Sequence, residues 1–111
     1  MKKIIIINGP NLNLLGKREG NIYGDISLED IKIKCEKKSN ELKIKLFFCQ
    51  SNNEGDLINY IHSAQNEFDG IIINPAALTH TSIALLDALR AIDKPKVEIH
   101  LSNIYNREDY R

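Results

Sequence analysis

Residues Lys3 to Asn8 read KIIIIN, and they are followed directly by Gly9 to Gly24, GPNLNLLGKREGNIYG. Four consecutive isoleucines are β-branched and too few for a helix, which predicts a central strand buried on both faces. The segment after them is polar and rich in glycine. Because structureless loops of more than about 12 to 15 residues are uncommon unless they bind or cover something, we interpret residues 9–24 as a lid loop. We expect this loop to be mobile when empty and ordered around a ligand.

The composition limits the class of protein. The 111 residues predict one domain, and 15 basic against 15 acidic residues leave no net charge to attract nucleic acid or an anionic membrane. The isoleucine run is much shorter than a signal-peptide core or a bilayer span, so we expect a cytoplasmic protein. Cys35 and Cys49 lack C-x-x-C spacing. They are therefore interpreted as reduced, partly buried thiols, and neither a disulfide nor a metal site is expected.

Helix and strand patterns alternate after the lid. Ser27 precedes Leu28, Glu29 and Asp30, an arrangement that predicts a helix with a serine cap and an acidic first turn. Its expected buried stripe comprises Leu28, Ile31, Cys35 and Leu42. Lys43 to Gln50 alternates lysine with apolar side chains, which is typical of an edge strand, and we place it outside Ile4 to Ile7.

The second half of the chain repeats this alternation. A helix begins around Glu54 to Asp56, and its apolar face is formed by Leu57, Ile61, Ala64 and Phe68. Gly70 to Asn74, GIIIN, predicts a second wholly apolar strand, followed by a loop over residues 75–81. A further helix passes through Ile83, Leu86, Leu89 and Arg90 and stops before Lys94-Pro95, and Lys96 to His100 is the fourth predicted strand.

The order β-α-β-α-β-α-β predicts an α/β protein with a parallel sheet and helices on both faces. We expect a flavodoxin-like three-layer fold with strand order 2-1-3-4. Ligands of such sheets bind at the carboxyl ends of the strands. Polar residues follow the first, third and fourth predicted strands, at residues 8–23, 74–81 and 100–103, so three loops are expected to converge on one rim.

The residues expected at this rim do not match the motifs of several sites that are common in such folds. The first loop is neither G-x-G-x-x-G nor G-x-x-x-x-G-K-[ST], which disfavours nucleotides. A response regulator would end the third strand with aspartate, where this chain has Asn74. His62, His80 and His100 lack metal-ligand spacing, so no metal is expected. With these kinds of site disfavoured, the remaining interpretation of the rim is acid–base chemistry by tyrosine, arginine, histidine and glutamate.

The residues alone leave two interpretations of each candidate. Glu98 and His100 lie two positions apart on a strand, so both face one side and Glu98 can orient the imidazole and raise its affinity for a proton. The alternative is a surface ion pair at an exposed strand end. Tyr23 is a poor base unless Arg18 stabilises its anion, and otherwise it is a surface loop residue. Ordinary interpretations also exist for other candidates: a solvated basic face for Arg107 and Arg111, and a boundary residue or subunit contact for Asp87.

Three segments carry a resemblance to a known family. Gly9 to Gly24, Asn74 to Leu89 (NPAALTHTSIALLDAL) and Val97 to Arg111 (VEIHLSNIYNREDYR) resemble the signatures of the type II 3-dehydroquinate dehydratases, in the same order and at similar spacing. The resemblance implies a lyase of the shikimate pathway of aromatic amino-acid biosynthesis, which removes water from 3-dehydroquinate by anti elimination through an enolate. It implies no metal or cofactor, and a homo-oligomer built from trimers, a dodecamer.

The resemblance also implies roles for individual residues. Tyr23 would be the base, with Arg18 and Arg107 keeping it as tyrosinate, and Asn11 would position the water that stabilises the enolate. His100, oriented by Glu98, would protonate the departing hydroxyl. The implied substrate-binding groups are the backbone amides of Leu101 and Ser102 for the carboxylate, Asn74, His80 and Arg111 for the ring hydroxyls, and Asp87 reaching a neighbouring subunit's site.

Two other readings remain open. One is a catalytically silent or truncated homologue that acts as a binding or assembly module, and the other is a hydrolase using His100, although Ser102 lies on no nucleophile elbow. Similar proteins continue past Arg111 with a strand and a helix, so we expect the native polypeptide to continue or another chain to supply that edge. Without them, apolar surface on Ile73, Val97 and Ile99 should be exposed.

Overall fold

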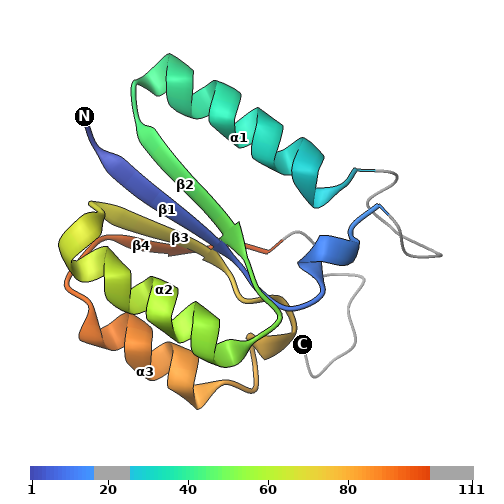
Figure 1. The fold of residues 1–111 in the computed structure, drawn as a ribbon. Coiled ribbons are helices and arrows are strands. Elements are labelled where there is room, and N and C mark those ends of the chain that lie inside the picture. The colour runs from blue at the N-terminus through green and yellow to red at the C-terminus, as the bar shows by residue number, and fades with distance from the viewer. Residues whose placement is uncertain (17–25, 101–111) are drawn as a thin grey trace.

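The computed structural model describes residues 1–16 and 26–100 of the chain (Figure 1). Within them, four parallel strands form one sheet in the order β2-β1-β3-β4, as predicted. The strands are β1 (Lys3–Asn8), β2 (Lys45–Gln50), β3 (Gly70–Asn74) and β4 (Lys96–Glu98). The helices are α1 (Leu28–Leu42), α2 (Glu54–Glu67) and α3 (Ile83–Ala91), with short 3-10 helices η1 (Leu12–Leu14) and η2 (Ala76–Leu78). The α/β architecture is therefore confirmed.

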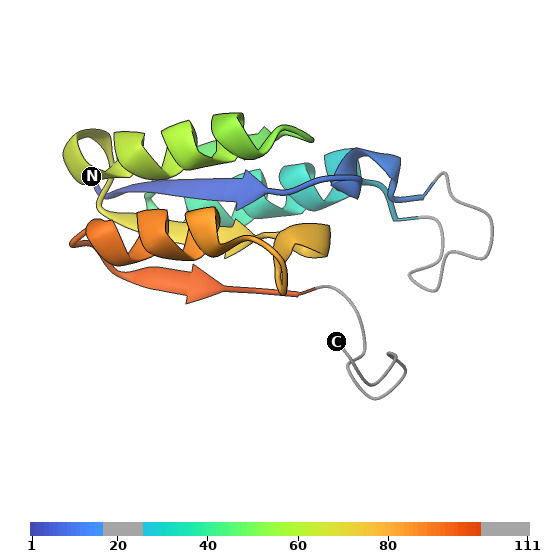
Figure 2. The same ribbon diagram turned by 90° about the horizontal axis from the view of Figure 1, so that it is seen from below.

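The isoleucine-rich strands place the core between the sheet and two helices. Ile5 and Ile7 of β1 and Ile71 and Ile73 of β3 are fully buried, and they pack with Leu57 and its neighbours on α2 and α3. On the opposite face, α1 packs against β2 and η1. The two views in Figures 1 and 2 show α2 and α3 side by side and α1 apart from them. Since β1 and β3 are central, their carboxyl ends are held rigidly.

Each of the three α-helices begins at a side-chain cap, and the sequence analysis identified one of them, Ser27. Ser27 accepts a hydrogen bond from the backbone of Asp30, whose carboxylate accepts one from the Ser27 backbone, a complete capping box. Asn53 caps α2, and Ser82 caps α3 by accepting from Leu85.

Two predicted strand boundaries are wrong. β2 begins at Lys45 rather than Lys43, because Lys43 adopts the left-handed conformation (φ 57°) that ends α1. β4 ends at Glu98 rather than His100, because the chain of its neighbour β3 turns away after Asn74. The Ile99 amide still donates to the Ile73 carbonyl at 2.8 Å, so His100 follows directly from the sheet.

The exposure of some apolar side chains differs from what the sequence predicted. Leu42 is 55% exposed and the other members of the predicted α1 stripe are half-buried, because α1 covers only the β2 side of the sheet. The sequence predicted exposed apolar side chains on and beside β4. Val97 is 54% exposed, as predicted, and Ile99 is partly exposed. The expectation was wrong for Ile73, which is 1% exposed: alternation along β3 turns it toward α2 and α3.

The described part of the lid loop is more structured than predicted. Residues 12–14 form η1, and Leu12 and Leu15 are buried, so this end of the loop is anchored by apolar contacts. The expected mobility concerns mainly residues 17–25, which lie outside the described residues.

Cys35 and Cys49 are both free and half-buried in this structure. Burial raises the pKa of the Cys49 thiol to about 12, so it is not a thiolate at neutral pH. No helix within residues 1–16 and 26–100 has the length and apolar character needed to cross a membrane.

Candidate active site

Five of the six predicted site residues that the structure describes gather at the carboxyl rim of the sheet. Asn11 follows β1, Asn74 ends β3, and Glu98 and His100 stand at the end of β4. His80 lies in the turn between η2 and α3. Because all strands are parallel, these segments, distant in sequence, meet at one end of the molecule (Figure 1).

Glu98 and His100 form a pair at this rim. Nε2 of His100 lies 3.4 Å from Oε2 of Glu98, and the imidazole is the more buried of the two side chains. A carboxylate at this distance from Nε2 favours one orientation of the imidazole ring. The arrangement suits a histidine that delivers a proton to a departing group.

Asn74 is the most buried polar residue of the rim, at 3% exposure. Its Oδ1 accepts a hydrogen bond from the Ala76 amide at 3.1 Å, and its backbone carbonyl accepts one from Gly9 at 2.8 Å. Since Oδ1 is occupied, Nδ2 is the atom of this side chain suited to donate to a ligand hydroxyl. Ala76 has φ 53°, an uncommon conformation for a residue with a side chain, and such strain tends to cluster at functional sites.

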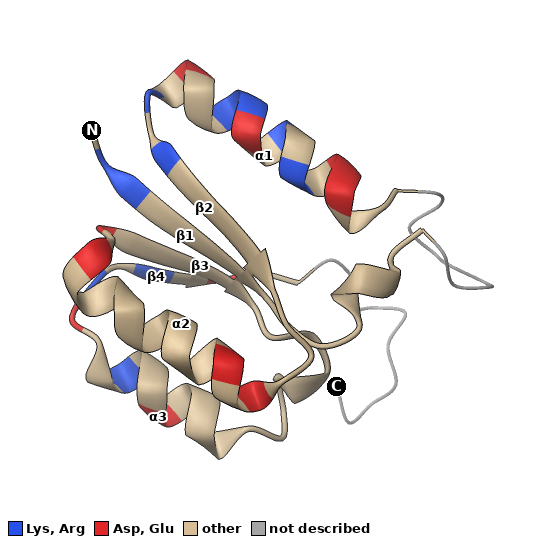
Figure 3. Cartoon of the chain, viewed as in Figure 1, with Lys and Arg blue, Asp and Glu red and all other residues tan. Residues whose placement is uncertain are grey.

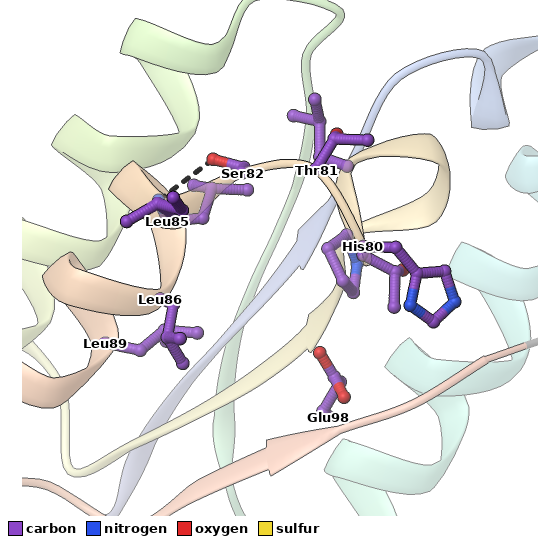
Figure 4. Close-up of a pocket in the computed structure, with 11 residues that line it drawn as sticks. His80, Thr81, Ser82, Leu85, Leu86, Leu89 and Glu98 are labelled. Atoms are coloured by element: carbon purple, nitrogen blue, oxygen red, sulfur yellow. Dashed lines mark hydrogen bonds between the residues drawn. The ribbon is translucent and has the colours of Figure 1, made fainter. Parts of the chain in front are cut away.

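A pocket of about 170 Å³ opens beside β4 and contains two of the predicted residues, His80 and Glu98. In Figure 4 the Glu98 carboxylate points from β4 toward the segment that carries His80. Ser82 fixes this segment, because its hydroxyl donates to Glu54 at 2.6 Å and accepts from the Leu85 amide at 3.0 Å. The apolar wall is formed by Pro75, Leu78, Ile83, Leu85, Leu86 and Leu89.

The sequence analysis missed a group of side-chain amides after β2. Nε2 of Gln50 donates to Oδ1 of Asn52 at 3.0 Å, and that same oxygen accepts from the Asn11 backbone amide at 2.9 Å. We call Gln50 and Asn52 the amide brace. The signal was available, since QSNN at residues 50–53 follows a predicted strand at the same rim as the other three loops.

The remaining predicted residues are not at the described rim. Asp87 is exposed in the middle of α3 and does not line the pocket. Six lie outside the described residues: Arg18, Tyr23, Leu101, Ser102, Arg107 and Arg111.

Acidic and basic side chains lie at opposite ends of the sheet. Acidic residues stand in the first turn of α2 at the carboxyl rim, and lysines stand at the opposite, amino ends of β1 and β2 (Figure 3). The rim segments within residues 1–16 and 26–100 carry Glu54, Asp56 and Glu98 but no lysine or arginine. Within residues 1–16 and 26–100, no group of three or more His, Cys, Asp or Glu side chains that could hold a metal ion occurs.

Comparison with known proteins identifies the family. The family model for dehydroquinase class II matches residues 2–111. A 3-dehydroquinate dehydratase of Thermoanaerobacter pseudethanolicus is 54% identical over 111 residues, which are all of this chain and 75% of that protein. One from Clostridium botulinum (strain 657 / Type Ba4) is 58% identical over 113 residues, covering all of this chain and 76% of its own length.

Solved structures agree with the sequence comparison. The crystal structure of a type II dehydroquinase from Butyrivibrio crossotus superposes with a TM-score of 0.92 at 44% identity, over 98% of this chain and 77% of that one. A second, from Propionibacterium acnes, has the same TM-score at 37% identity, over 99% of this chain and 76% of that one. With a family model that matches residues 2–111, relatives at this level of identity and solved structures of the same fold, the chain belongs to the class II dehydroquinase family.

Proposed function

We propose that this protein is a 3-dehydroquinate dehydratase of type II, a hydro-lyase that converts 3-dehydroquinate to 3-dehydroshikimate in the shikimate pathway. The observation that carries the proposal is the Glu98–His100 pair at the carboxyl rim of a chain belonging to this family. The pair supplies a histidine poised to protonate a departing hydroxyl, which is the second half of a dehydration.

The proposed reaction has two steps. Tyr23, held as tyrosinate by Arg18 and Arg107, removes a proton from the carbon beside the ketone, which gives an enolate. A water positioned by Asn11 stabilises the negative charge on its oxygen. His100 then protonates the hydroxyl on the opposite face of the ring, and the C–O bond breaks as the enolate collapses to the enone, releasing water. No cofactor takes part in the proposed steps.

Substrate binding is proposed to use groups that follow the third and fourth strands, together with a residue of α3. The ring hydroxyls are held by Asn74, whose Nδ2 is oriented to donate, together with His80 and Arg111. The backbone amides of Leu101 and Ser102 hold the carboxylate. Asp87, exposed on α3, is proposed to reach the site of a neighbouring subunit.

The proposal extends to the organisation of the whole protein. Residues 1–111 are assigned to a single domain in which residues 9–24 form the active-site lid. The protein is proposed to act in the cytoplasm as a homo-oligomer built from trimers, a dodecamer. Exposed apolar side chains on α3 and β4 support such an assembly.

Turnover of the purified protein tests the proposal. Incubation with 3-dehydroquinate should yield a product lighter by one water with the ultraviolet absorbance of a conjugated enone. Tyr23→Phe should lower kcat by roughly 10²- to 10⁴-fold while leaving binding of product-like acids largely intact, because the hydroxyl acts in the transition state. The matched control is Tyr60→Phe on α2, a half-buried tyrosine away from the rim, which should retain turnover.

Two results would contradict the proposal at different levels. A wild-type protein without turnover would favour the binding-module alternative. A Tyr23→Phe variant with more than about a tenth of wild-type kcat would leave the reaction in place but remove Tyr23 as its base.

A further inference from the structure

We propose that the amide brace, Gln50 and Asn52, is a positioning element of the active site that holds Asn11 in its working conformation. This inference rests on the proposed dehydratase function and on the role of Asn11 in it. It goes further by assigning a task to two residues that are themselves not placed against the substrate.

The hydrogen bonds of the amide brace run to both sides of Pro10. Oδ1 of Asn52 accepts from the Asn11 backbone amide at 2.9 Å and from Nε2 of Gln50 at 3.0 Å. Nε2 of Gln50 also donates to the Gly9 carbonyl at 3.2 Å. One oxygen of Asn52 therefore accepts two hydrogen bonds. The bond from Gln50 fixes the rotation of the Asn52 carboxamide, and this keeps Oδ1 of Asn52 in place to accept from the Asn11 amide.

Asn11 needs this support because of its backbone. It has φ 69° and ψ −3°, the left-handed region, which costs an L-residue roughly 1–2 kcal/mol, although asparagine tolerates it better than most. The residue is exposed, so no packing holds it. Returning to a right-handed or extended conformation would turn its side chain in another direction, and the hydrogen bond from its amide to Asn52 opposes that change.

The other side of the same turn is already fixed. The Gly9 amide donates to the Asn74 carbonyl at 2.8 Å, which ties the turn to β3. The amide brace ties it to the end of β2, so the turn is held between the two strands that flank β1. Asn11 and Asn74 are thereby kept in a constant relation to one another.

The energetics separate a positioning role from a structural one. Hydrogen bonds between neutral, solvent-accessible groups contribute little net free energy of folding, so removing the amide brace should change Tm only slightly. Displacing a catalytic group by about 1 Å can lower the rate roughly 10²-fold. A positioning role therefore predicts a loss of kcat out of proportion to the loss of stability.

Four variants make the test specific. Asn52→Ala removes the acceptor, whereas Asn52→Asp keeps an oxygen that accepts both hydrogen bonds. Gln50→Glu places a carboxylate against the Gly9 carbonyl and Oδ1 of Asn52, where a donor is required. The matched control is Asn53→Ala, which removes a side-chain acceptor in the same loop, the one that caps α2 through Asp56, without touching the Asn11 turn.

Two measurements are made on each full-length variant: steady-state kinetics with 3-dehydroquinate, and hydrogen exchange of the Asn11 amide. Asn52→Ala and Gln50→Glu should lower kcat at least about 30-fold with KM changed less than about threefold, because Asn11 acts on the enolate rather than on the bound substrate. Exchange of the Asn11 amide should accelerate at least about tenfold in Asn52→Ala, since that amide loses its acceptor. Asn52→Asp and Asn53→Ala should stay within about threefold of wild type in kcat, although Asn53→Ala lowers Tm.

The outcomes distinguish the two levels of the proposal. If Asn52→Ala retains more than half of wild-type kcat, or if Asn53→Ala loses as much activity, the positioning role is wrong while the dehydratase function stands. Asn52→Asp behaving like Asn52→Ala would also overturn it. A wild-type protein without turnover would refute the proposed function instead, and amide exchange would still decide whether the amide brace holds the turn.

Discussion

Gly9 occupies a position at the carboxyl rim where no side chain fits. A Cβ atom there would lie 2.5 Å from the Pro75 carbonyl oxygen and 2.8 Å from its carbon, both backbone atoms that cannot rotate away. Gly9→Ala should therefore push β1 from β3 and lengthen the bond from the Gly9 amide to Asn74. We expect a loss of about 1–3 kcal/mol in the free energy of unfolding, measured by urea denaturation.

The matched control is Gly55→Ala in the first turn of α2. Its Cβ would approach only Oδ1 of Asn53, at 3.1 Å, a side-chain atom that can shift. Alanine is favoured over glycine in helices by up to about 1 kcal/mol, so this variant should be unchanged or more stable. Equal denaturation midpoints for Gly9→Ala and wild type would contradict the steric assignment.

For individual residues, the sequence predicted where the candidate site residues lie better than it predicted their backbone conformations and hydrogen bonds. The convergence of Asn11, Asn74, Glu98 and His100 followed from one rule, that parallel strands end at one rim. The left-handed conformation of Ala76 left no signal in the sequence. The contacts of the amide brace were not predicted either, because they join loops that are distant in sequence. The chemical roles of individual residues came from the family resemblance, since spacing alone left a surface ion pair equally open.

At the scale of single elements, α1 begins at the capping box of Ser27 and Asp30, and this cap makes its stability depend on pH. Hydrogen bonds from the backbone and side chain of Ser27 hold the pKa of the Asp30 carboxyl below its ordinary value of 3.8. A carboxyl whose pKa is lowered by folding stabilises the protein above its unfolded pKa, and this stabilisation is lost as pH falls through the folded value. Asp30→Asn should thus have a lower Tm than wild type at pH 7, and the difference should vanish below the folded pKa.

Thermal unfolding at a series of pH values between 7 and 2 checks this prediction. Glu29→Gln is a suitable comparison, because it removes an acid from the same helical turn that takes no part in the capping box. It should lower Tm less at pH 7, by the helix-dipole interaction alone. A Tm difference for Asp30→Asn that is constant with pH would contradict the proposed linkage.

Element identities were more predictable than element ends. Runs of isoleucine and serine or asparagine caps are local signals, so every predicted strand and helix is present. The ends of β2 and β4 were misplaced because they depend on the left-handed Lys43 and on where β3 turns away, which no local pattern records. The overestimated burial of Leu42 has the same origin, since it depends on how much of the sheet α1 covers.

For the whole molecule, the proposed assembly of copies predicts that exposed apolar side chains on α3 become buried. Ile83 is 81% exposed, and Leu86 on the next turn of the same helix is also exposed. Ile83→Glu should lower the mass of the assembly, because a charge at an apolar contact is costly to bury. Sedimentation analysis or light scattering measures this, and circular dichroism should show an intact fold.

Ile33→Glu on α1 provides the control for surface charge in general. Ile33 is likewise exposed, but it lies on the helix of the opposite layer, away from α3. We expect it to leave the mass unchanged. If both variants assemble like wild type, the contact surface lies elsewhere, and if both dissociate, the effect is not specific to α3.

The overall topology was fully accessible from the sequence, because parallel strands joined by helices allow few arrangements. The charge of the completed site was less accessible from the described structure, where the rim holds acids and the three arginines with proposed roles lie in residues 17–25 and 101–111.

The central place of β1 has a consequence for the newly synthesised chain. β1 leaves the ribosome before both of its partners, which begin only at Lys45 and Gly70. At roughly 5–20 residues per second, four adjacent isoleucines wait several seconds before both neighbours exist. Such a segment is prone to pair with other nascent chains, and charged residues beside it act as gatekeepers. Lys2 and Lys3, which have no part in the proposed chemistry, stand in that position, where their like charges oppose pairing between copies of the strand.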